Sequence, residues 1–119
     1  MSDSKIGPWI TITLDDNDQT TAEVDLGAEF QHVQVENPTI ISGAITVQVA
    51  RATGGTFLQV YRHKSNATGD VAHSATARTG AGMNFFRDIC GQFIKINTGA
   101  SQTAGPLTLY ARGVGKLGP

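Results

Sequence analysis

The sequence predicts an all-β fold, an antiparallel β-sandwich or jelly-roll-like domain of about seven or eight short strands with little or no helix. Apolar and polar residues alternate along most of the chain, which is typical of half-buried strands. Segments rich in Gly, Asn and Asp separate these runs and favour turns. No apolar stripe with helical spacing occurs, so helices are not expected.

The first three strands are predicted from the alternation in the N-terminal third of the chain. Residues 9–14 alternate Ile or Leu with Thr, and the acidic run 15–18 then forms a turn. A second strand is expected at 22–26, and Gly27 ends it. A third covers 30–35 and ends at an Asn-Pro pair, because proline removes a backbone donor from the sheet.

A β-hairpin is the clearest prediction in the middle of the chain. Residues 44–50 and 56–62 alternate on either side of a Gly-Gly turn, which is a good hairpin signal. The following stretch, 63–84, is polar, with a weak strand at 71–77.

Apolar residues return in the last third of the chain, at 85–90 and 92–97, and a single helical turn is one interpretation of 85–91. A Gly- and Ser-containing loop then leads to a final strand at 107–112.

A chain of 119 residues has room for one domain with its own core. We place this domain at 9–112, after an N-terminal arm at 1–8. Residues 113–119 contain three glycines without an amphipathic period, which predicts a flexible C-terminal tail.

Composition and charge argue against several classes of function. The net charge is −1, so no long-range field attracts nucleic acid or an anionic membrane. The apolar runs are too short to span a bilayer, and the N-terminus lacks the pattern of a secretory signal. The single cysteine, Cys90, cannot form an intrachain disulfide. We therefore expect synthesis in a reducing cytoplasm, with neither nucleic acid nor membrane as a partner.

No residue pattern predicts catalysis or a bound cofactor. His32, His63 and His73 do not have the spacing of zinc ligands, so no metal site is expected. Cys90 is interpreted as a small buried hydrophobe, since a nucleophile needs a neighbouring base. The run 15–18 lacks the Gly and the distal Glu of a calcium loop and is interpreted as a solvated turn. We therefore expect a protein that is not an enzyme.

Aromatic residues among the polar positions of the strands suggest a partner interface. Alternation places Trp9, Tyr61 and Tyr110 on the face opposite the aliphatic residues. Exposed aromatics there would mark a binding surface. The alternative is that both faces are covered, or that Trp9 closes one end of the core. The candidate interface, which includes a short basic segment, consists of Trp9, Tyr61, Arg62, His63, Lys64 and Tyr110.

An ordered series of features covers most of the chain from about Val24 onward. The series is an alternating strand (45–49), a Gly-Gly hairpin, an aromatic strand (57–61), a polar middle (63–84), an aromatic-aliphatic strand (93–97) followed by Thr-Gly, and a Thr/Leu strand (107–112). In this order the chain resembles small accessory virion proteins of tailed bacteriophages. It departs from them in its His-, Lys- and Asn-containing middle and its extended ends.

The resemblance implies a non-enzymatic virion protein located on the capsid surface. Its expected role is that of a decoration (cement) protein that binds the major capsid protein and stabilises the phage head. A homo-oligomer is implied, with a trimer favoured. Two alternatives remain open: a neck or tail component of the virion, and a carbohydrate-binding β-sandwich that uses Trp9, Tyr61 or Tyr110 as stacking platforms for sugar rings.

Overall fold

The structure, a computed structural model, describes residues 5–63, 70–72, 80–103 and 105–118, and these form strands without any helix. All strand pairs are antiparallel, which confirms the predicted all-β class. The strands are β1 (Ile10–Leu14), β2 (Val24–Asn37), β3 (Thr46–Ala50), β4 (Leu58–Gln59), β5 (Tyr61–His63), β6 (Asp70–Ala72), β7 (Gly82–Phe86), β8 (Gly91–Asn97) and β9 (Leu107–Lys116). Within this part of the chain there is consequently no helix that could cross a membrane.

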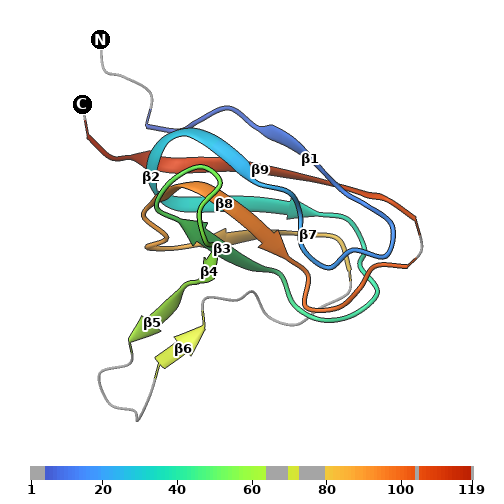
Figure 1. Ribbon diagram of the computed structural model, residues 1–119. Coiled ribbons are helices and arrows are strands. Elements are labelled where there is room, and N and C mark those ends of the chain that lie inside the picture. Colours follow the sequence, from blue (N-terminus) through green and yellow to red (C-terminus); the bar gives the residue numbers. More distant parts are fainter. Residues whose placement is uncertain (1–4, 64–69, 73–79, 104, 119) are drawn as a thin grey trace.

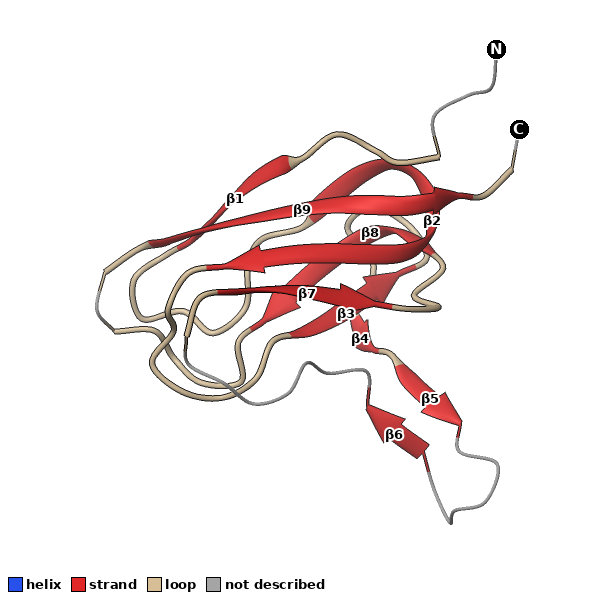
Figure 2. Cartoon of the chain, turned by 180° about the vertical axis from the view of Figure 1, so that it is seen from behind, coloured by secondary structure: helices blue, strands red, loops and turns tan. Residues whose placement is uncertain are grey.

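Seven of these strands form one curled sheet (Figure 1). The order is β1-β9-β2-β8-β3-β4, and β7 pairs with β2 beside β8. Strands β5 and β6 form a separate two-stranded sheet, which projects away from the main sheet in both views (Figures 1 and 2). Figure 2 shows β1, β9, β2 and β7 side by side in one half of the curled sheet.

Strand β2 joins the two halves of the curled sheet. One edge of β2 pairs with β9 from Phe30 to Glu36. The other edge pairs first with β8, at Val24, Asp25 and Phe30, and then with β7 over the last five residues of the strand. The register shifts between Asp25 and Phe30, where Gly27 has a φ of 89°. A glycine in this conformation allows a β-bulge, which bends the strand without ending it.

The predicted boundary at Gly27 is therefore wrong. The predicted strands at 22–26 and 30–35 are parts of one strand of 14 residues, which begins at Val24 and contains the bulge at Gly27. Glycine inside a strand pattern is compatible with a strand end or a bulge. The second half of the strand pairs with β9, a segment far away in the sequence, and this pairing extends the strand through the bulge.

The inner face of the curled sheet carries the hydrophobic core. Ile12 and Leu14 of β1 are buried while Thr11 and Thr13 are exposed, which confirms the predicted alternation. The apolar core residues with no exposed surface come from four different strands; they are Val33, Val35, Val47, Ile94, Ile96, Leu109 and Ala111.

The central hairpin is shorter than the sequence predicts. Strand β3 pairs with β4 through only two residue pairs, Gln48 with Gln59 and Val49 with Leu58. The chain then leaves the main sheet, and β5 pairs with β6. Strand β6 overlaps the start of the weak strand predicted at 71–77, and the rest of that range lies outside the described residues. No helical turn forms at 85–91, because the first two of these residues belong to β7.

Strand β9 continues four residues beyond its predicted end. The glycine-rich segment 113–116 pairs with β2, so the start of the predicted tail is part of the sheet. The Phe30 ring lies directly over Gly113, where a Cβ atom would be 2.1 Å from Phe30 Cγ. The N–H of Gly7 donates to the carbonyl of Gly113 at 2.8 Å, so part of the predicted N-terminal arm is also held against β9. The absence of a side chain is thus a packing requirement at Gly113.

Buried Gln102 connects three loops at one end of the core. Its Oε1 accepts the N–H of Ile41 at 2.7 Å, and its Nε2 donates to the carbonyl of Ala100 at 2.9 Å. Its backbone carbonyl accepts the N–H of Asn17, and its own N–H donates to the carbonyl of Asp18. Because a buried polar side chain is costly unless it is hydrogen-bonded, this set of bonds specifies the loop arrangement.

We expect Gly113→Ala to destabilise the protein by about 1–3 kcal/mol, because the new methyl group overlaps the Phe30 ring in a packed core. Urea unfolding followed by circular dichroism measures this change. Gly80→Ala is the matched control, since a Cβ atom at Gly80 meets no atom within 4 Å. Equal unfolding midpoints for the two variants would contradict the proposed packing requirement.

Candidate interaction face

The solvent side of β1, β9, β2 and β7 carries the candidate interaction face. Side chains that alternate with the buried ones point outward from these four neighbouring strands. We call this surface the outer face, and it comprises Trp9, Thr11, Gln34, Glu36, Met83, Phe85, Tyr110 and Arg112.

Four large side chains of the outer face are exposed. The exposed fraction is 40% for Trp9, 38% for Tyr110, 47% for Phe85 and 50% for Met83. Tyr110 stands on β9, Met83 and Phe85 stand on β7, and Trp9 lies beside the start of β1; the outward residues of β2 between them are the polar Gln34 and Glu36. Apolar side chains that are exposed together on one surface indicate an interaction site, whereas apolar residues scattered singly over a surface do not.

A row of contacts crosses the outer face from β1 to β2. The guanidinium of Arg112 lies over the Trp9 ring, 4.4 Å from its centroid. The Nε of Arg112 donates to Oε1 of Gln34 at 2.8 Å. Gln34 in turn is opposite Phe85 on β7. Because the guanidinium of Arg112 contacts both Gln34 and the Trp9 ring, it links Trp9 to β2 and restricts the positions that the ring can take.

His32 supports the β7 side of this surface. Its ring centroid is 5.3 Å from that of Phe85, and its Nδ1 accepts the N–H of Asp88 at 3.1 Å. No group of three or more potential metal ligands occurs in the part of the chain that the structure describes. His63 lies in β5, and His73 lies outside the described residues.

The structure brings together two of the six predicted interface residues. Trp9 and Tyr110 both stand on the outer face, at the β1–β9 pair. The backbone of Tyr61, Arg62 and His63 forms β5, which belongs to the separate two-stranded sheet. Lys64 lies outside the described residues.

Sequence reasoning missed Met83 and Phe85 as surface residues. The Phe-Phe pair at 85 and 86 contained the signal, because neighbouring residues of a strand point to opposite faces. Phe86 is buried in the core at 3% exposure, whereas Phe85 is on the outer face. Which phenylalanine is inside depends on the pairing with β2, which the sequence does not reveal.

The interpretation of Cys90 as a buried residue is wrong, because Cys90 is exposed. The N–H groups of Ile89 and Cys90 both donate to the carbonyl of Gln31, at 2.7 and 3.1 Å. In this tight turn Cys90 has a φ of 53°, and Ile89 takes the buried position.

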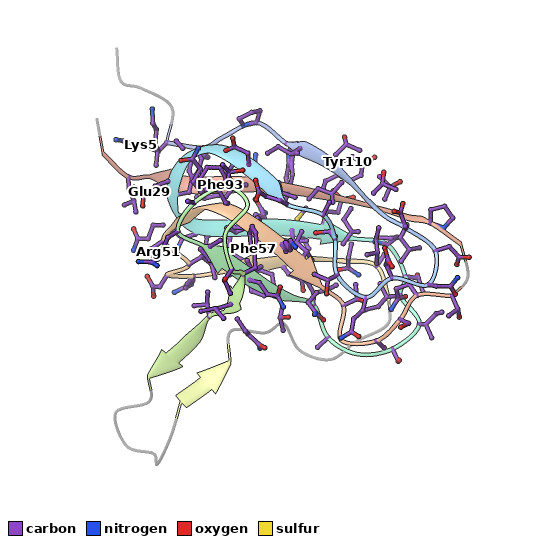
Figure 3. The ribbon with its side chains drawn as sticks, in the orientation of Figure 1. Lys5, Glu29, Arg51, Phe57, Phe93 and Tyr110 are labelled. Atoms are coloured by element: carbon purple, nitrogen blue, oxygen red, sulfur yellow. The ribbon has the colours of Figure 1, made fainter. Side chains whose placement is uncertain are left out.

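Cys90 opens onto a hollow of about 330 Å³ on the opposite half of the curled sheet. Glu29, Arg51 and Phe93 also line this hollow, and Figure 3 shows them at the end of the molecule away from Tyr110. None of its lining residues is a histidine, so the described residues do not form a Cys–His pair there.

Two carboxylates accept hydrogen bonds from the β3–β4 turn and from the bulge of β2. Glu23 accepts hydrogen bonds from the hydroxyl of Thr53 and the N–H of Gly54, and these bonds lower the pKa of Glu23. Asp25 accepts from Nε2 of Gln92 and the N–H of Gly27, which lowers the pKa of Asp25 in the same way. Both carboxylates therefore have a structural role in the sheet.

Comparisons with protein-family models, with curated proteins and with solved structures find no match to this chain.

We expect the carboxyl of Glu23 to titrate below its ordinary pKa of 4.5, and Thr53→Ala to move its pKa towards that value. Because folding lowers this pKa, the associated stability is present above the ordinary value and is lost as the pH falls through the folded-state pKa. Carbon-detected NMR titration measures both midpoints. Thr56→Ala, in the same turn, is the control that leaves the Glu23 midpoint unchanged.

Proposed function

We propose that this protein is a non-enzymatic structural protein of a virion, a decoration (cement) protein that binds the outer surface of a tailed-phage head and stabilises it. The observation that carries the proposal is the outer face, a rigid sheet surface on which Trp9, Tyr110, Phe85 and Met83 are exposed together. The resemblance to accessory virion proteins supplies the identity of the partner, the major capsid protein.

The composition of the outer face suits a protein partner. Aromatic residues, Met and Arg are enriched in protein–protein interfaces relative to the rest of the surface. Tryptophan, tyrosine and arginine are also enriched among binding hot spots, and here Tyr110 and Arg112 stand on β9 while Trp9 precedes the neighbouring strand β1. Because the opposite side of the same strands is core, little conformational entropy is lost when a partner binds.

The alternative of a carbohydrate-binding module is less well supported. Sugar rings bind by stacking on the open faces of aromatic side chains. One face of the Trp9 ring is already covered by the Arg112 guanidinium, at 4.4 Å from the ring centroid. A neck or tail component of the virion is the closer alternative, since it would use the same outer face for contacts between ring subunits.

We expect the purified protein to co-sediment with empty heads assembled from the major capsid protein of the same phage, whose gene we expect beside the gene of this chain. The double variant Trp9→Ala/Tyr110→Ala should bind about tenfold to hundredfold more weakly, because it removes two aromatic anchors. Leu58→Ala is the matched control, since Leu58 is 66% exposed but lies on β4, in the other half of the sheet.

Three results separate the alternatives. Unchanged head binding by the double variant would remove the outer face as the binding site. Failure of the wild-type protein to bind heads, together with binding to isolated necks or tails, would favour the neck or tail alternative. Binding to a glycan array that is lost in the double variant would favour the carbohydrate-binding module.

A further inference from the structure

Strand β1 lies at the edge of the curled sheet. It pairs with β9 through five consecutive residues, Ile10 to Leu14, and no described strand pairs with its other side. A hollow of about 270 Å³ flanks this side, lined by residues 10–13 of β1 and by residues 22–25. Residues 22–25 line the same hollow, but they form no strand pair with β1, so the backbone groups on this side of β1 are not paired with any described strand.

This edge lacks the usual protection against pairing with another strand. Edge strands are commonly protected by lysine, proline or a bulge within the strand. The segment Ile10–Leu14 contains only Ile, Thr and Leu, and its register with β9 is regular. Pro8 precedes it, and Asp15 and Asp16 follow it, so an uncharged edge of five residues is bounded on both sides.

The five residues of β1 are complementary to themselves in the antiparallel direction. With a two-fold axis at Ile12, Ile10 is opposite Leu14 of the second copy, Thr11 is opposite its Thr13, and the two Ile12 residues face each other. The aliphatic residues then meet on the buried side and the threonines on the exposed side. Cross-strand aliphatic and Thr–Thr pairs of this kind stabilise antiparallel sheets.

The residues that flank β1 select this register. A slip of one residue would place the aliphatic side chains of one copy on the exposed face. Moving the axis to Thr11 brings Pro8, which has no N–H, opposite Leu14. Moving it to Thr13 brings Asp16 opposite Ile10. Only the register centred at Ile12 pairs all five residues of the strand with one another.

We infer that two copies of this chain associate by antiparallel pairing of their β1 edges about an axis at Ile12. The outer faces of the two copies then lie on the same side of a continuous sheet, because a two-fold axis perpendicular to a sheet preserves its faces. An edge of five residues buries less than a standard interface of about 1,600 Å², so the association is weak and depends on protein concentration. It uses a different surface from the proposed capsid contact and does not rest on it.

Sedimentation equilibrium in the presence of a reductant, which prevents cross-linking through exposed Cys90, tests this inference. We expect a monomer–dimer equilibrium for the wild-type protein. Thr11→Lys/Thr13→Lys places two lysine pairs across the interface and should weaken the association by about tenfold or more. Thr11→Lys/Thr13→Glu changes the same exposed positions but places each lysine opposite a glutamate, and it should restore the dimer.

Controls separate loss of pairing from loss of folding. Thr108→Lys changes an exposed residue on the neighbouring strand β9, opposite Thr13, and should leave the equilibrium unchanged. Thermal unfolding shows whether each variant is folded. Independently of any variant, amide hydrogen exchange in β1 of the wild-type protein should slow as the protein concentration rises.

A wild-type protein that is monomeric at all concentrations, or one that forms the trimer implied by the resemblance to virion proteins, would overturn the inference. So would a folded Thr11→Lys/Thr13→Lys variant that dimerises like the wild type, or β1 amide exchange that does not change with concentration.

Discussion

The curled sheet depends on the double pairing of β2. This strand contributes one edge to β9 along its second half, while its other edge is shared between β8 and β7. The bend at Gly27 makes this possible, because a bulge with a left-handed glycine redirects the strand and keeps its backbone groups available for pairing. Without this bend the two halves of the sheet could not face a common core.

Two further sites maintain this arrangement at the ends of the core. Phe30 follows the bulge, and its ring packs on Gly113 of β9, so β2 and β9 approach closely. At the loop end, Gln102 and Thr98 are buried, and their bonds satisfy the polar groups of several loops. The contact of Phe30 with Gly113 specifies the fold by shape, and the bonds of Gln102 and Thr98 specify it by hydrogen bonding. Few other side chains would meet either requirement.

The same pairing that builds the core also creates the two surfaces with a proposed function. Because β1, β9, β2 and β7 are neighbours, exposed side chains from distant parts of the sequence form one outer face. Because β1 is at the end of this order, one side of its backbone pairs with no described strand beside that face. Pairing of two β1 edges would join two outer faces, and binding through two linked faces increases avidity for a repetitive surface such as a capsid.

The sequence by itself determined the all-β class, the inward and outward faces of strands such as β1, and the placement of Trp9 and Tyr110 opposite the aliphatic residues; that this opposite face is uncovered came from the structure. The features that the sequence determined follow from the period of two, which is a local property of each strand. It did not determine the bulge at Gly27, the extension of β9 past Arg112, the outward position of Phe85 or the exposure of Cys90. Each of these depends on which distant strand or turn supplies the partner: β9 for β2, β2 for β7, and the carbonyl of Gln31 for the turn at Cys90. Only the tertiary structure decided them, because a glycine, a pair of phenylalanines or a cysteine is locally compatible with more than one environment.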